Sequence, residues 1–203
     1  MTRDEQRRLI ARVRRGECEA FRELVEAYKD RLFAYVWRMV RNHHEAEDIC
    51  QAAFVRAYEA LDSYNDNYAF STWLYTIAYR LCLNHLRKRH ASAGRGSLEV
   101  EPPRDPAPDA GHRLAGSEQA RRLKERIWSA VDRLTPAQKT AVVLFYREGK
   151  SCNEIGRVLG IPAVTVKSHL HRARAKLREI LGPEVASVWS DVQHDSEAWA
   201  ASS

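Results

Sequence analysis

Basic and hydroxyl side chains crowd one stretch near the carboxyl end of the chain. Residues 163–178 contain no Asp or Glu, and at helical spacing most of their outward positions are cationic or polar. Arg and Lys can bind guanine edges or phosphates, and Ser can bind several bases. We therefore predict a DNA-contacting surface with these candidate residues: Thr165, Lys167, Ser168, His171, Arg172 and Arg174. A solvated basic helix face has the same composition, so the neighbouring elements must decide between the two interpretations.

A second cluster combines aromatic and cationic side chains over residues 64–90. Separating DNA strands takes a base out of its stack, which costs a few kcal/mol. Stacking on aromatic rings recovers about 1–3 kcal/mol per base, and a cationic groove follows the backbone. The candidates for these contacts are Tyr64, Asn65, Tyr68, Tyr75, Tyr79, Arg80, Asn84, Arg87 and Lys88. Aromatic residues also fill cores. We interpret Phe70 and Trp73 in that way, and for Tyr64 and Tyr68 both interpretations stay open.

An acidic, hydrogen-bonding face marks the helix predicted to begin at about residue 44. It consists of Glu45, Glu47, Asp48 and Gln51. Such a face can steer a basic protein partner, although acids at a helix start are also favoured by the helix macrodipole. Another interpretation takes His43, His44, Glu47 and Asp48 as metal ligands, because His43 and Glu47 are four residues apart. Acids at helix starts are far commoner, so we predict no metal site and no cofactor.

The elements that must position these groups are helices. Thr2-x-x-Glu5 is a capping box, and apolar residues then recur at helical spacing to about Val40. The helix from about residue 44 has as its inward face Ile49, Ala53, Phe54, Ala57 and Leu61. Residues 62–68 are rich in Asp, Asn and Ser and predict a loop. A fourth helix begins at about Phe70, with these side chains inward: Trp73, Leu74, Ile77, Ala78 and Leu81.

The second helical block has sharper boundaries. Residues 135–138 form a capping box with proline at the first helical position, and Ser151-x-x-Glu154 forms another. The short helix that follows is broken by Gly160, and Pro162 opens a longer helix. A short helix, a tight turn and a longer helix make a helix-turn-helix, whose second helix enters the major groove. This context favours the DNA-contacting interpretation of residues 163–178.

Proline and glycine divide the chain. Residues 91–117 include Gly94, Gly96, Pro102, Pro103, Pro106 and Pro108, a density that blocks regular structure. We therefore predict an all-α protein of two small helical domains, residues 1–90 and 118–182, joined by a flexible linker at 91–117. Residues 183–203 form a carboxyl-terminal tail, for which docking and disorder both stay open.

Composition narrows the class of protein. The formal net charge is +6 and the isoelectric point is about 9.3, which favours nucleic acid or an anionic membrane surface as a partner. No apolar run approaches the roughly 20 residues of a membrane span, so we predict no membrane insertion. The chain opens without the apolar core of a signal peptide, and its four cysteines form no C-x-x-C pair. We expect a cytoplasmic protein.

Three groups of motifs resemble the extracytoplasmic-function sigma factors. Leu134-Thr135-Pro136-Ala137-Gln138, Leu159-Gly160-Ile161-Pro162 and Thr165-Val166-Lys167-Ser168 are similar to the fourth sigma region. Ala46-Glu47-Asp48-Ile49-Cys50-Gln51 with Phe54 resembles the polymerase-binding helix of the second region. Ala69-Phe70-x-x-Trp73-Leu74-Tyr75 followed by Asn84-x-Leu86-Arg87 resembles its melting segment. The family commonly has Glu where this chain has Ala52, and often Asn where it has Arg80.

The resemblance implies a function for each surface. Core RNA polymerase would bind Glu47, Asp48, Gln51 and Phe54. The cluster from Tyr64 to Lys88 would melt the −10 element and hold a flipped base, and Thr165 to Arg174 would recognise the −35 element of promoter DNA. Family members also usually have an anti-sigma partner.

Two other classes of function compete with this assignment. A helix-turn-helix activator or repressor would need a ligand-binding or receiver domain within residues 3–90, where no alternating strand and helix pattern appears. An enzyme acting on nucleic acid would need a phosphate-binding glycine loop, clustered carboxylates or a nucleophile motif. None is evident, so we predict that the chain is not an enzyme and has no catalytic residues.

Overall fold

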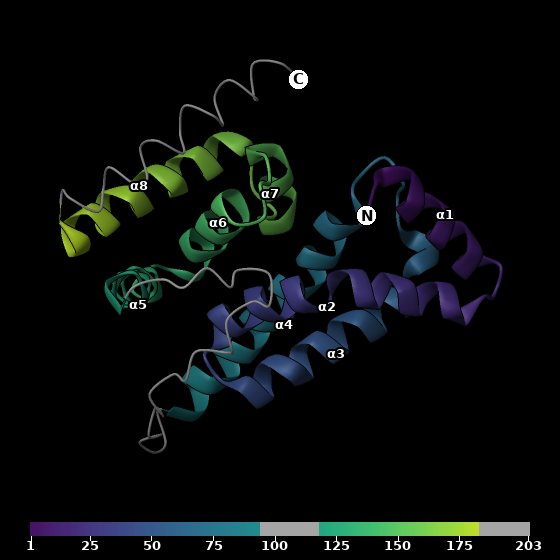
Figure 1. The fold of residues 1–203 in the computed structure, drawn as a ribbon, viewed down its shortest axis with the longest axis horizontal. Helices are drawn as coiled ribbons and strands as arrows, with labels where there is room; N and C mark the ends of the chain where they lie inside the picture. The colour runs from purple at the N-terminus through teal and green to yellow at the C-terminus, as the bar shows by residue number, and fades with distance from the viewer. Residues whose placement is uncertain (94–117, 183–203) are drawn as a thin grey trace. The chain divides into compact units, whose positions relative to one another are not determined.

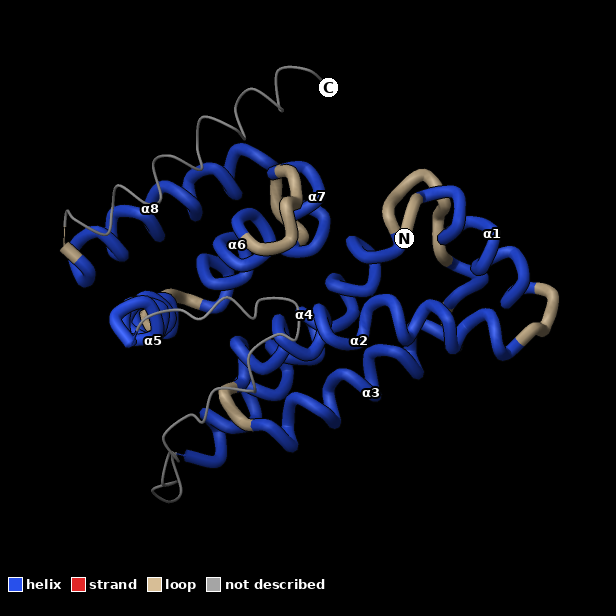
Figure 2. The backbone as a smooth tube through the Cα atoms, viewed as in Figure 1, coloured by secondary structure: helices blue, strands red, loops and turns tan. Residues whose placement is uncertain are grey.

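The computed structural model describes residues 1–93 and 118–182, and every regular element in those ranges is a helix (Figures 1 and 2). This confirms the all-α prediction. The chain forms two compact units, Met1–Arg104 and Asp105–Ser203. Residues 94–117 of the predicted linker and the predicted tail at 183–203 are not among the residues that the structure describes. Residues 91–93, which we assigned to the linker, belong to the last helix of the first unit.

The first unit contains four α-helices and one short 3-10 helix. They are α1 (Arg3–Arg14), α2 (Cys18–Val40), α3 (His43–Glu59), η1 (Leu61–Ser63) and α4 (Phe70–Ala93). The long α2 packs against α1, α3 and α4, and α3 also packs against α4 (Figure 1). The core is apolar and includes Leu24, Leu32, Val36, Ala53 and Phe70. Burial of these side chains is the main source of stability for such a bundle.

The helix starts follow local capping chemistry. Thr2 and Glu5 exchange both hydrogen bonds of the predicted capping box. Asn42 caps α3 by accepting from the Glu45 N–H at 3.0 Å, a cap that the sequence analysis did not identify. The residue before it, Arg41, ends α2 in the left-handed conformation with φ of 59°. The tight α2–α3 connection therefore depends on Arg41 and Asn42.

The buried face of α4 differs from the predicted one. Leu74 and Ala78 are buried as expected, but Trp73, Ile77 and Leu81 are only half-buried. Tyr75 and Tyr79 are buried instead, together with Cys82. The physical reason is that α4 packs against both α2 and α3, so two sides of the helix are covered rather than one narrow stripe.

The second unit is the helix-turn-helix that the sequence predicts. Its helices are α5 (Glu118–Asp132), α6 (Pro136–Tyr146), α7 (Cys152–Leu159) and α8 (Ala163–Leu181). Both predicted capping boxes form, at Thr135 and Ser151. Gly160 closes α7 with φ of 71°, and α8 packs against α5, α6 and α7. The turn therefore has the geometry needed to present the start of α8 to a DNA groove.

Gly156 allows the two helices of this motif to approach each other. A Cβ atom on Gly156 would lie 2.6 Å from the carbonyl oxygen of Ile161, which is too short for any real contact. We expect Gly156→Ala to destabilise the second unit by about 1–3 kcal/mol, because backbone must shift. Thermal unfolding measured by circular dichroism tests this, with Asn153→Ala as a control at an exposed site of the same helix. Alanine is the better helix former by about 1 kcal/mol, so a stabilised Gly156→Ala variant would contradict the close approach.

Candidate nucleic-acid and protein interfaces

The outward face of α3 is acidic at its start and apolar further along. Glu47, Asp48 and Gln51 are exposed, as predicted for a protein-binding face. Val55 lies one turn beyond Gln51 and is 55% exposed. Sequence reasoning missed Val55, although it falls outside the inward stripe and therefore signalled an exposed apolar position. Protein interfaces commonly combine charged side chains, which guide the encounter of the partners, with apolar side chains that are buried on binding.

Two predicted members of this face point elsewhere. Phe54 is 8% exposed and packs in the core, which corrects its assignment as a direct polymerase contact. The Glu45 carboxylate is half-buried and lies 2.9 Å from Nε2 of His85 on α4. Glu45 therefore ties α3 to α4 rather than extending the acidic face.

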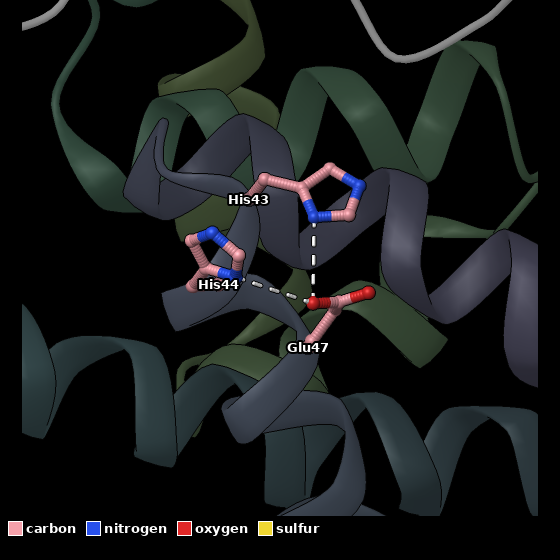
Figure 3. A group of neighbouring side chains, drawn as sticks. All are labelled: His43, His44 and Glu47. Atoms are coloured by element: carbon pink, nitrogen blue, oxygen red, sulfur yellow. Dashed lines mark ion pairs between the residues drawn. The ribbon is translucent and has the colours of Figure 1, made fainter.

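Three side chains at the start of α3 converge on one point (Figure 3). Nδ1 of His43 lies 3.4 Å from a Glu47 carboxylate oxygen, and Nδ1 of His44 lies 3.7 Å from the same atom. The ligand atoms of all three lie within 4.8 Å of one another. Imidazole and carboxylate suit a borderline divalent cation such as Zn²⁺. Our prediction excluded a metal on grounds of frequency, whereas this geometry is compatible with one; all three residues are exposed.

The loop that follows α3 presents polar side chains to solvent and buries one tyrosine. Asn65 is exposed and Tyr68 is 40% exposed, so both are accessible to a base. Tyr64 is 4% exposed and packs against Phe70 and Trp73, with ring centroids 5.7 and 5.2 Å away. Burial raises the pKa of Tyr64 to about 12. Of the two interpretations left open, packing therefore accounts for Tyr64, whereas Tyr68 is exposed enough for a base to reach it.

The other two predicted aromatic contacts are also corrected. Tyr75 is 3% exposed, and its ring meets that of Tyr35 edge-on at 5.2 Å. Tyr79 is 8% exposed, and burial raises its pKa. A base can stack only on a ring whose face is open. Tyr75 and Tyr79 therefore belong to the core of the first unit, not to its DNA-facing surface.

A polar and cationic stripe runs along the outside of α4. Its members Arg80, Asn84, Arg87 and Lys88 are all exposed. Their spacing of four, three and one residues places them on neighbouring turns of one helix face. Such a stripe can follow a phosphate backbone while its amide contacts a base edge.

The buried cysteines offer no reactive site in this unit. Burial raises the pKa of both Cys50 and Cys82 to about 12. A thiol with such a pKa stays protonated and unreactive at neutral pH. These residues act as small apolar side chains between α3 and α4.

The outward face of α8 contains most of its predicted DNA contacts. Lys167, Ser168, His171 and Arg172 are exposed, and Thr165 is half-buried. Val164, at the start of the same face, is 69% exposed and was missed because apolar residues were assigned inward. An apolar side chain there can contact a thymine methyl group.

Arg174 differs from the other predicted α8 contacts. Its Nε donates to the Tyr146 hydroxyl at 2.7 Å, and its guanidinium lies 5.9 Å from the centre of that ring. This contact ties α8 to α6. Arg174 therefore supports the motif in this structure, and Lys167 and Arg172 are the exposed cations among the predicted α8 contacts.

Two family models match the chain, Sigma-70 region 2 over residues 24–92 and Sigma-70 region 4 over residues 124–177. The ECF RNA polymerase sigma factor SigW of Bacillus subtilis is 36% identical over 179 residues, covering 85% of this chain and 94% of that protein. CnrH, solved with the cytosolic domain of CnrY, is 25% identical with a TM-score of 0.65, covering 87% of this chain and 97% of that one.

A further structure shares the fold. The sigma factor RpoE of Bartonella quintana, solved with the anti-sigma factor NepR, has a TM-score of 0.62 at 23% identity, covering 80% of this chain and 97% of that one.

These findings define the protein as an RNA polymerase sigma factor, which directs the polymerase to promoters. Within that class, the chain belongs to the extracytoplasmic-function sigma factors. The alternative of a helix-turn-helix activator or repressor is not favoured, because sigma region 2 occupies the part where such a regulator would carry its sensing domain. No described helix has the length and apolar character needed to cross a membrane.

Proposed function

We propose that three exposed surfaces divide the work of initiation. The α3 face of Glu47, Asp48, Gln51 and Val55 binds core polymerase. The segment between α3 and α4 (the 61–68 loop, which includes η1) and the α4 stripe bind the −10 element, and the α8 face binds the −35 element. One observation supports this most: the charged members of the three surfaces differ in sign, with the acids Glu47 and Asp48 on the α3 face and only cations on the α4 stripe and the α8 face. Acidic side chains attract a basic protein surface, whereas cationic side chains attract DNA phosphates. Each surface of this chain therefore suits a different partner.

The −10 surface would act by capturing a base that leaves its stack. Unstacking costs a few kcal/mol, and both Tyr68 and Asn65 are exposed in the same loop. Arg87 and Lys88 lie further along the same unit and can neutralise phosphates. The loop would therefore select the base while the helix holds the strand.

We expect Tyr68→Ala to slow promoter melting roughly tenfold or more, because base stacking contributes about 1–3 kcal/mol. Permanganate reactivity of unpaired thymines in the holoenzyme complex measures this. Tyr68→Phe keeps the ring and should melt the promoter at nearly the normal rate. If Tyr68→Ala and the unaltered protein melt the promoter at the same rate, Tyr68 does not contact the unstacked base.

The same proposal includes a regulatory partner and a compartment. The structural neighbour CnrH was solved with a second protein, and a protein that covers the α3 or α8 face of this chain would block polymerase or DNA. We infer an anti-sigma factor of this kind, and a cytoplasmic location where polymerase and DNA are present. The chain contributes binding and melting, and polymerase supplies the catalysis, so we infer that the chain is not itself an enzyme.

Transcription in vitro with core polymerase on a genomic library tests the proposed function as a whole. Mapped start sites should share two sequence elements at fixed spacing. Start sites without a common upstream pair of elements would contradict the division of work between the units.

A further inference from the structure

The first helix of the chain lies against the loop that is proposed to recognise the −10 element. Arg14 of α1 donates from Nη2 to the carbonyl oxygens of Leu61 at 3.2 Å and Tyr64 at 2.7 Å. Its Nη1 forms an ion pair with the Asp66 carboxylate at 3.3 Å. One guanidinium therefore binds three acceptors spread across the loop.

Arg3, at the other end of α1, binds the same loop further along. Its Nη2 donates to the carbonyl oxygens of Asn67 at 2.7 Å and Asp66 at 3.4 Å. Arg3 and Arg14 together bind the backbone on both sides of Asn65. Within the loop, the Asn67 N–H donates to the Asn65 side-chain oxygen at 2.9 Å.

A buried hydrogen-bond chain joins α1 to the centre of the loop. Gln6 is 4% exposed, and its Nε2 donates to the Tyr64 hydroxyl at 3.2 Å. The Tyr64 hydroxyl in turn donates to the carbonyl oxygen of Tyr68. Gln6 also accepts from the Tyr28 hydroxyl of α2 at 3.1 Å, so the chain is anchored in the helical bundle. The position of Tyr68 therefore depends on a buried residue of α1.

These contacts all reach the loop from the side of α1, and they leave the side chains of Asn65 and Tyr68 accessible. A recognition loop selects one base well only if its contacting groups are held in place before the base arrives. Charged donors on backbone carbonyls are among the stronger hydrogen bonds that can hold a loop.

We propose that Arg3 and Arg14 of α1 are positioning residues for −10 recognition, which fix the 61–68 loop so that Asn65 and Tyr68 can select the flipped base. This rests on the proposed function of the loop. Neither arginine needs to touch DNA for this role, because each acts through its hydrogen bonds to the loop: Arg3 to the carbonyls of Asp66 and Asn67, and Arg14 to the carbonyls of Leu61 and Tyr64 and to the Asp66 carboxylate.

The test compares Arg14 variants in the full chain, assembled with core polymerase. The measurement is the ratio of open-complex formation rates on a matched promoter and on one with the selected −10 base replaced. We expect Arg14→Ala to reduce this ratio about tenfold, a change typical of losing charged hydrogen bonds. Arg14→Lys keeps one charged donor and should recover part of the ratio. Tyr64→Phe removes the hydroxyl of the buried chain and should reduce the ratio in the same direction.

Arg12→Ala is the matched control. Arg12 lies on the same helix and pairs with Glu17 and Glu23 instead of the loop, so its loss should leave the ratio unchanged. An unchanged ratio in Arg14→Ala, or an equal drop in Arg12→Ala, would overturn the proposal. A lower slope of promoter affinity against salt in Arg14→Ala would also overturn it, since that indicates a direct phosphate contact.

Failure of the proposed loop function gives a different pattern. If Asn65→Ala and Tyr68→Ala leave the ratio unchanged, the loop does not select the base at all. If those two variants reduce the ratio and Arg14→Ala does not, only the positioning role is wrong.

Discussion

Charge reversal at Asp48 is expected to reduce the affinity for core polymerase at least 100-fold, since like charges at an interface cost several kcal/mol. Asp48 is exposed on α3 between Glu47 and Gln51, and among the described residues none forms a hydrogen bond or ion pair with its carboxylate. Asp48→Lys should therefore leave the fold intact while it repels a basic partner surface. Fluorescence-detected titration of labelled protein with core enzyme measures the affinity.

Asp30→Lys provides the control for this variant. Asp30 is exposed on α2, and its reversal changes the net charge of the chain by the same amount. If both variants bind core equally well, α3 is not the docking surface. If both lose affinity equally, the effect is one of total charge and not of a specific face.

Loss of Lys167 and Arg172 together is expected to remove recognition of the −35 element. Both side chains are exposed on α8, and together with the exposed Ser168 and His171 they form the accessible polar part of its face. Each base or phosphate contact contributes about 1–3 kcal/mol, so the double variant should lose roughly 30-fold or more in affinity for the distal element. Competition between matched and scrambled −35 sequences in the holoenzyme measures this.

Lys176→Ala is the comparison for the α8 variant, because Lys176 is exposed on the same helix but about one turn beyond Arg172, further from the start of the helix. Its loss should change affinity for all sequences alike, without altering the preference for a matched element. The affinity for core polymerase should be unchanged in both the double variant and Lys176→Ala. A double variant that still prefers the matched −35 sequence would show that α8 does not recognise it.

Capping and turn signals predicted the helix-turn-helix well because each helix boundary depends on residues that are close together in the sequence. The capping boxes at Thr135 and Ser151 and the left-handed Gly160 each depend on neighbours within four positions. The close approach at Gly156 was not predictable in this way, because it depends on how the backbone of Ile161, in the turn five residues further on, folds back against α7. Local chemistry sets where helices start and end, and tertiary packing sets how close they come.

For the predicted −10 surface, in contrast, the sequence indicated the right kinds of side chain but not which of them are exposed. Tyr75 and Tyr79 carry the right side chains for stacking, but their faces are covered because α4 is packed on two sides. Arg3 and Arg14 looked like ordinary basic residues of a first helix, and nothing in the sequence signals that their partners lie about 50 to 60 positions away. Residue type identifies a chemistry, whereas only the fold shows which side chains are free to perform it.

Association of the purified chain with core polymerase, followed by initiation at a promoter with both elements, tests the central claim most directly. The account predicts a stable complex that opens the promoter at a defined site and requires both elements. Tight, sequence-specific binding of the chain to promoter DNA with no detectable association with the core enzyme would contradict it.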